Sequence, residues 1–74
     1  MALKLNVVIE KDRDGYYASC PELPGCQTQG DTFEEVMANI QEAAELYLET
    51  LPVREQRKIA RKQIVTTSLE VSVA

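Results

Sequence analysis

Twenty residues, Tyr16–Glu35, constrain the fold of this chain more than any other part of it. They read YYASCPELPGCQTQGDTFEE. Pro21 and Pro24 remove two backbone donors, so the PELPG segment predicts an elbow between two short strands, Tyr16–Cys20 and Cys26–Gln29. An aspartate and a threonine then precede two glutamates in the spacing of a helix capping box. Strand, elbow, strand and helix start therefore follow one another within this run.

The rest of the chain adds two alternating segments and two helical ones. Leu3–Glu10 and Ile64–Val73 alternate apolar and polar residues, which predicts half-buried strands. Apolar residues recur at three- and four-residue steps from Phe33 until Pro52, which predicts a long amphipathic helix. Residues 53–62 predict a second, short basic helix.

This order of elements predicts an α+β fold, β-β-β-α-(α)-β, with the long helix on one face of a mixed four-stranded sheet. The long interval before the last strand rules out a hairpin with the third. We therefore place the last strand parallel to the first, after a right-handed crossover, in the order 3-2-1-4. Seventy-four residues make one domain, 1–74, whose small core favours self-association.

The charge is unevenly distributed along the chain. The formal net charge is −4; residues 1–51 hold ten acids and three bases, whereas five bases fall within Arg54–Lys62. An acidic body suits a basic partner and argues against binding nucleic acid with that body, because phosphate neutralisation needs Lys and Arg. The basic segment leaves nucleic-acid contact open as an alternative to a solvated helix face.

The residues that carry most enzyme chemistry are missing from this chain. It has no histidine, which excludes Ser-His-Asp triads, Cys-His pairs and histidine metal ligands. Cys20 and Cys26 lack both redox-motif spacing and an activating neighbour, so we interpret them as buried thiols. Asp12, Asp14 and Asp31 are typical turn aspartates without the rest of a calcium loop. We expect no catalytic residue, cofactor or metal.

The N-terminus shows no targeting signal. Met1-Ala-Leu-Lys runs directly into a strand pattern, without the apolar core of a signal peptide. No stretch approaches the length that a membrane span needs. We therefore expect a cytoplasmic protein without membrane association, whose cysteines are reduced.

Taken in order, these residues resemble the HicB-like antitoxins of type II toxin–antitoxin systems. The resemblance covers nearly the whole chain and is carried by six segments: Leu3–Glu10, Asp14-Gly15-Tyr16-Tyr17, Pro21-Glu22-Leu23-Pro24-Gly25-Cys26, Gly30-Asp31-Thr32, Glu34-Glu35 through Ile40-Gln41-Glu42-Ala43, and the terminal Val65–Val73. It implies a partial ribonuclease-H-like fold. It also implies a HicA-like partner toxin, a small basic ribonuclease that cleaves mRNA, and a homodimer or larger homo-oligomer.

The resemblance implies a protein that docks on its toxin and neutralises it. We expect Tyr17, Glu22 and Leu23 to contact this partner, because elbows and exposed aromatics are common recognition elements. Local packing or a homodimer contact is the alternative for Tyr17 and Leu23.

Two departures from the family pattern limit the functions that the resemblance implies for this chain. Many HicB proteins continue into a C-terminal DNA-binding domain, but this chain stops at Ala74, so we do not expect operator binding. Asn6, Glu10 and Glu70 do not make the acidic cluster of a two-metal nuclease. The remaining rivals are a trimmed metal-dependent nuclease and an orphan homo-oligomeric binding protein of the same fold, contacting nucleic acid through Arg54–Lys62.

Overall fold

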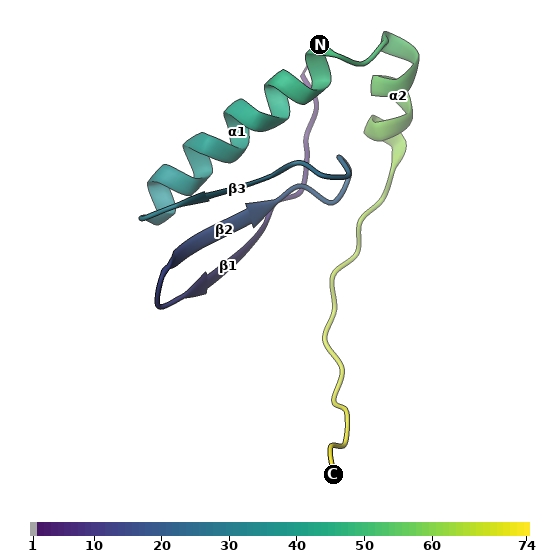
Figure 1. Ribbon diagram of the computed structural model, residues 1–74. Helices are drawn as coiled ribbons and strands as arrows, with labels where there is room; N and C mark the ends of the chain where they lie inside the picture. Colours follow the sequence, from purple (N-terminus) through teal and green to yellow (C-terminus); the bar gives the residue numbers. More distant parts are fainter. Residues whose placement is uncertain (1) are drawn as a thin grey trace.

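The computed structural model describes residues 2–74, and these residues form three strands and two helices (Figure 1). In chain order the elements are β1 (Val8–Asp12), β2 (Gly15–Ser19), β3 (Gln27–Gly30), α1 (Phe33–Glu49) and α2 (Val53–Arg61). The strands pair antiparallel in the order β1-β2-β3, and α1 lies across one face of this sheet (Figure 1). The predicted α+β class is confirmed.

The sheet has one covered face and one open face. Tyr17 pairs with Glu10 of β1 and with Gln29 of β3. Because successive side chains of a strand point to opposite faces, Tyr17 faces away from α1, whereas Ala18 faces it and is buried. The alternation therefore assigns Tyr17 and its register partners to the open face.

Helix α1 begins as the sequence predicts. The Thr32 hydroxyl accepts a hydrogen bond from the Glu35 N–H at 3.0 Å, which caps the first turn. The helix approaches β3 closely, since a Cβ on Gly30 would lie 2.8 Å from the Val36 nitrogen. Asn39 adds a side-chain hydrogen bond of 2.9 Å to the Gln29 carbonyl. These contacts hold α1 against the third strand.

The core lies between α1, β2 and the elbow. Its buried apolar members are Ala18, Cys20, Leu23, Cys26, Val36 and Ile40. Phe33 and Met37, which the helical periodicity assigns to the core, are 49% and 37% exposed. Three short strands cover only part of α1, which leaves these two side chains partly uncovered.

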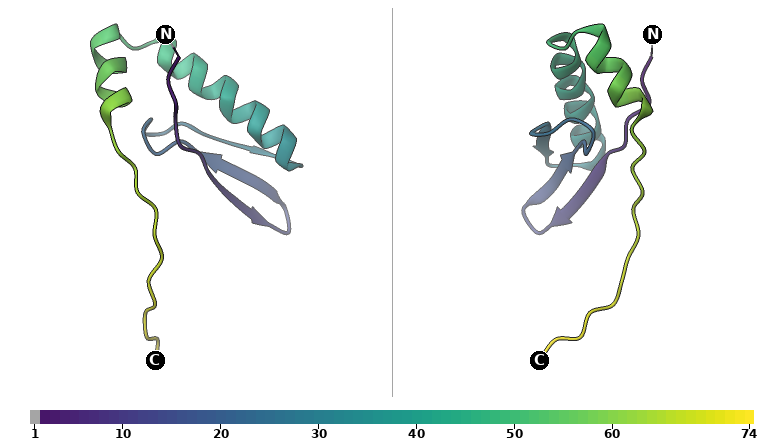
Figure 2. Two further views of the ribbon diagram at one scale, coloured as in Figure 1. Left: turned by 180° about the vertical axis from the view of Figure 1, so that it is seen from behind. Right: turned by 90° about the vertical axis from the view of Figure 1, so that its right-hand side faces the viewer.

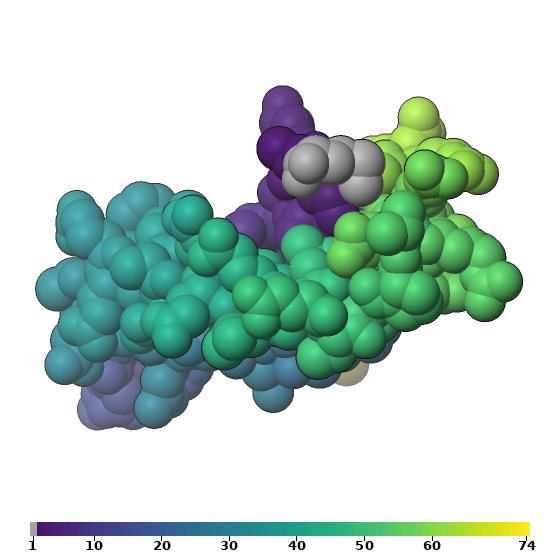
Figure 3. All heavy atoms as spheres, turned by 90° about the horizontal axis from the view of Figure 1, so that it is seen from above, coloured from purple at the N-terminus to yellow at the C-terminus, as the bar shows by residue number. Residues whose placement is uncertain are grey.

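Helix α2 packs at the C-terminal end of α1 (Figure 3), and its Gln56 lines the same hollow as Ala2 and Leu3. The Gln56 Nε2 atom donates to the carbonyl oxygens of Leu48 and Leu51 at 3.0 and 3.2 Å. The Leu48 carbonyl belongs to the last turn of α1, where backbone carbonyls lack i+4 helical partners, and Leu51 follows the end of that helix. Ile59 adds a half-buried contact with the core.

The expected fourth strand is not formed in the structure. Residues 63–74 are extended, and no backbone hydrogen bond joins them to another part of residues 2–74. They leave α2 and run away from the sheet, as the views in Figures 1 and 2 agree. The order within residues 2–74 is thus 3-2-1 rather than 3-2-1-4. Alternation predicts that a segment can be a strand, but a ladder forms only where an edge lies within reach.

The first strand is shorter than predicted but has the predicted faces. Its ladder spans Val8–Asp12, and residues 2–7 run up to it without a ladder of their own. Leu3, Leu5 and Val7 are half-buried, whereas the residues between them are exposed. The alternation is therefore confirmed over the whole segment, although only its second half is paired.

Candidate partner-binding surface

The elbow between β2 and β3 is closed by its own backbone. The Cys20 N–H donates to the Cys26 carbonyl at 3.1 Å, and the Leu23 N–H donates to the Cys20 carbonyl at 3.0 Å. The Cys26 N–H donates to the Leu23 carbonyl at 2.9 Å. Gly25 takes a φ of +83°, which side chains strongly disfavour. The prolines thus produce a compact turn rather than a loose loop.

Two of the three predicted contact residues are buried inside this elbow. Leu23 is fully buried and Glu22 is 4% exposed, so the expectation that both lie on the surface is wrong. The exposed tip consists of Pro24 and Gly25. The turn directs Leu23 into the core, where its side chain is packed. For Leu23, the structure therefore agrees with the alternative prediction of local packing.

Glu22 joins the elbow to the N-terminal segment. Its carboxylate accepts hydrogen bonds from the Asn6 N–H at 3.0 and 3.2 Å and from Asn6 Nδ2 at 2.9 Å, and the Cys20 thiol lies 3.8 Å away. Burial alone would raise the pKa of Glu22, but the hydrogen bonds from Asn6 outweigh it and hold the pKa below its ordinary value. The sequence gives no sign of this contact, because sixteen positions separate the two residues.

The two cysteines are free, buried thiols, as predicted. Burial raises the pKa of the Cys20 thiol, and the neighbouring Glu22 carboxylate raises it further. Burial also raises the pKa of Cys26. Thiols with raised pKa values carry little thiolate at neutral pH and are poor nucleophiles. This geometry gives the pair a packing role.

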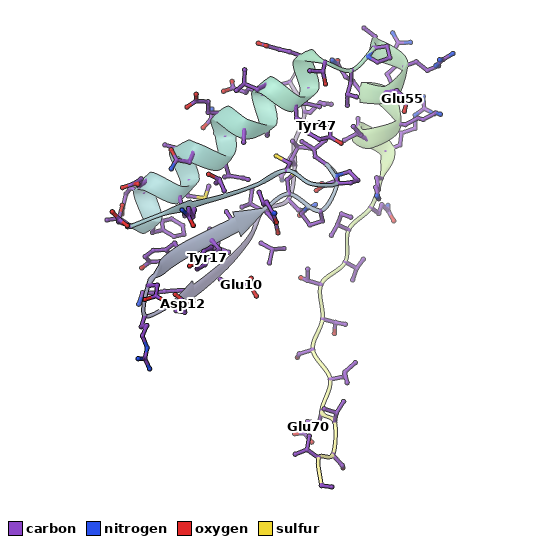
Figure 4. All side chains as sticks on the ribbon, in the orientation of Figure 1. Glu10, Asp12, Tyr17, Tyr47, Glu55 and Glu70 are labelled. Carbon is purple, nitrogen blue, oxygen red and sulfur yellow. The ribbon has the colours of Figure 1, made fainter. Side chains whose placement is uncertain are left out.

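Tyr17 is the predicted contact residue that the structure places on the surface. It is 38% exposed. Figure 4 shows it beside Glu10 on the sheet, away from α1. We call its surroundings the open sheet face, which consists of Val8, Glu10, Tyr17, Ser19, Gln27 and Gln29. A shallow hollow of about 340 Å³ lies among these residues. An aromatic ring with apolar and polar neighbours is a common anchor in protein interfaces.

Acidic side chains gather at one end of the molecule, next to Tyr17. Asp14, Asp31 and Glu35 line a second hollow together with Tyr17. We call this the acidic end, which consists of the β1–β2 turn and the first turn of α1, with Asp12, Asp14, Asp31, Glu34 and Glu35. Within residues 2–74, no group of three or more His, Cys, Asp and Glu side chains has an arrangement that could hold a metal ion.

The opposite end carries the basic helix. Arg54, Arg57, Lys58 and Arg61 of α2 are all exposed, and Lys58 pairs with Glu55 at 3.5 Å. Figure 1 shows α2 at the far end of α1 from the β1–β2 turn. The charge asymmetry of the sequence is therefore partly an asymmetry in space, since Glu45 and Glu49 line the same hollow as Gln56 of α2. No helix in the described part of the chain is long and apolar enough to cross a membrane.

A comparison with known protein families identifies the family of this chain. A family model described as the HicB-like antitoxin of bacterial toxin–antitoxin systems matches residues 5–71. The chain belongs to the HicB-like antitoxin family. The resemblance seen in the sequence is confirmed over the two hairpin-forming strands, the elbow, both helices and most of the extended tail.

Relatives of this HicB-like chain occur in distant bacteria and in an archaeon. A UPF0150 protein of Helicobacter pylori is 44% identical over 70 residues, which cover 95% of this chain and 97% of the relative. A UPF0150 protein of Synechocystis is 46% identical over 68 residues, covering 90% and 85%. One of Archaeoglobus fulgidus is 45% identical over 64 residues, covering 85% and 93%. No solved structure is a significant match.

Proposed function

We propose that this HicB-like protein is an antitoxin that binds a small, basic, HicA-type mRNA-cleaving toxin and blocks its active surface. The observation that carries the proposal is the family match over residues 5–71. The acidic end beside Tyr17 supports it, because complementary charge speeds the encounter with a basic partner and fixes its orientation. The proposed activity is binding rather than catalysis, and the proposed place of action is the cytoplasm.

The proposed contact surface is the open sheet face together with the acidic end. Tyr17 offers the aromatic anchor, with Glu10 and Val8 beside it. Glu22 and Leu23, being buried, contribute by holding the elbow and the neighbouring strands in place. The side chains that touch the toxin in this proposal are therefore those of Tyr17 and its register partners.

We further propose a homodimer or larger homo-oligomer of single-domain chains, residues 1–74, with a partial ribonuclease-H-like fold. Three antiparallel strands and a helix on one face agree with the first part of that fold. The alternating residues 64–73 supply the sequence of a fourth strand. A chain of this length gains most from additional burial between copies.

The direct test is an RNA-cleavage assay with a HicA-type toxin encoded beside this protein. We expect the two chains to co-purify as a stable complex and cleavage to stop once the HicB-like protein is in excess. Cleavage at the full rate in the presence of saturating HicB-like protein would overturn the antitoxin assignment.

Replacing the aromatic anchor tests the proposed surface. Tyr17→Ala should weaken toxin binding by roughly tenfold or more, since truncating a central aromatic anchor costs upwards of about 1–2 kcal/mol. Leu46→Ala is the matched control, because Leu46 is 56% exposed on α1 and lies outside the open sheet face. Isothermal titration calorimetry measures both. Equal affinities for the two variants would place the toxin on another surface.

A second function, nucleic-acid contact, is favoured by one specific observation. Helix α2 exposes four basic side chains on a short segment, of which Lys58 has an acidic partner. A mobility shift that falls steeply with salt, and that disappears in Arg57→Glu with Arg61→Glu, would support this function. A shift that is absent at low salt would exclude it.

A further inference from the structure

The tail, residues 63–74, has the alternating pattern of a strand but pairs with no strand within residues 2–74. Val65, Leu69, Val71 and Val73 are 71–87% exposed. Alternation of β-branched and small polar residues favours pairing at a half-buried edge. The radius of gyration is 14.4 Å, compared with about 11 Å for a compact chain of this length. An extended row of exposed apolar side chains marks an interaction surface.

The body has an apolar groove beside an unpaired strand edge. The groove has a volume of about 740 Å³ and lies between Leu3, Leu5 and Val7 on one wall and Met37, Ile40 and Leu48 of α1 on the other. Strand β1 pairs on one side only, with β2. Residues 2–7, which lead into β1, form one wall of the groove. An added strand would therefore find free backbone groups along β1 and, next to the residues before it, an apolar floor for alternate side chains.

The tail and the groove match in chemistry and in direction. Glu70 is the single charged residue among positions 63–74, so this tail is poorly suited to recognise a basic toxin or a nucleic acid. Residues 2–12 and the tail run in the same general direction in all three ribbon views (Figures 1 and 2). A tail that enters this groove in the direction it takes in its own chain would be parallel to β1.

The groove of the same chain is not where the tail goes. Helix α2 is fixed against the end of α1 by Gln56, and the chain continues beyond Lys62 away from the sheet. Figure 4 shows Glu70 far from the open sheet face and from α1. A second copy carries the same groove and the same tail. Two copies that exchange tails cover both grooves, pair both β1 edges and form a closed, two-fold symmetric assembly.

We propose that two copies of this chain exchange their tails, each tail adding as a parallel fourth strand beside β1 of the other copy and filling its groove. Val65, Leu69, Val71 and Val73 face the groove, and Ser68 and Ser72 face solvent. This inference rests on the homo-oligomer proposed above and gives it an interface. It does not involve the toxin, so its failure leaves toxin neutralisation to be judged by the cleavage assay alone.

Isotope-filtered NMR on the full-length protein tests the exchange directly. A sample mixed from ¹³C-labelled and unlabelled chains should show intermolecular methyl contacts between Leu69 or Val71 and Leu5 or Leu48. Contacts confined to single chains would mean that the tail folds back on its own body. A tail without long-range contacts would mean that it stays free. Either result overturns the proposal.

A pair of tail variants supplies an independent measurement. Leu69→Asp should raise the dimer dissociation constant by at least about 100-fold in analytical ultracentrifugation, because it places a charge in the apolar groove. Ser68→Asp, one position away on the opposite face, should change it by less than about fivefold. A wild-type monomer at all concentrations, or a dimer that Leu69→Asp leaves intact, refutes the exchange. Circular dichroism verifies that both variants keep the folded body.

Discussion

At the scale of single residues, one buried carboxylate connects parts of the chain that are far apart in sequence. Glu22 accepts its side-chain hydrogen bonds from Asn6 and from Cys20, which lies two positions before it. These bonds attach the N-terminal segment, and with it one wall of the apolar groove, to the elbow. A buried charge with full hydrogen bonding is tolerated, whereas the same charge without partners is costly.

The stability of the protein should therefore decrease in acid through Glu22. Its pKa is below the ordinary value in the folded state, so its contribution is present above the ordinary pKa of 4.5 and is lost as the pH falls through the folded value. Glu22→Gln should lower the melting temperature at pH 7 and flatten the acid slope of the free energy of unfolding. Glu34→Gln, at an exposed position, is the control. Parallel acid slopes in Glu22→Gln and wild type would contradict this role.

A glycine sets the shape of the elbow. Gly25 has a φ of +83°, although a Cβ there would meet no atom within 4 Å. Gly25→Val should thus destabilise the fold by about 1–2 kcal/mol through backbone strain alone, without a clash. Gly25→Asn should cost less, because asparagine tolerates left-handed conformations. Chemical denaturation compares the two variants. Equal stability of Gly25→Val and wild type would show that the elbow relaxes freely.

At the scale of elements, the long helix was the most predictable part of the structure. Its periodicity, its capping threonine and its end before Pro52 all lie in local sequence, and α1 follows them. The burial of Glu22 and Leu23 was not predictable, because a run of prolines and a charge is typical of a surface turn. Tertiary contacts with Asn6 and the core decide it instead. The same holds for Gln56, whose acceptors lie in the last turn of α1 and in the connection that follows it.

The apolar stripe of α1 provides a test of this element. Ile40 is 2% exposed at the centre of the core, so Ile40→Asp buries an unpaired charge and should unfold the domain. Leu46→Asp, on the exposed side of the same helix, should change stability by less than about 0.5 kcal/mol. Thermal melts followed by circular dichroism distinguish the two. A cooperative, native-like melt of Ile40→Asp would contradict the packing described here.

At the scale of the whole molecule, the sequence predicts the first three strands of the sheet better than it predicts the position of the last alternating segment. Three strands, their antiparallel order and the covering helix follow from turns and alternation. The position of the last strand does not, because Ile64–Val73 has the pattern of a strand whichever chain supplies its neighbour. Local sequence indicates that a segment has the pattern of a strand, and the course of the chain beyond Lys62 determines whether an edge lies within its reach.

The placement of charge at two ends has a physical consequence for how this protein meets others. The acidic end and the basic helix α2 lie at opposite ends of α1, and together they form an electric dipole (Figure 1). A cationic partner exerts a torque on such a dipole and turns the acidic end, with Tyr17, toward itself before contact. The association and dissociation rates of the complex should therefore respond differently to salt. Added salt should slow association, because it screens this torque, and should leave the dissociation rate nearly unchanged.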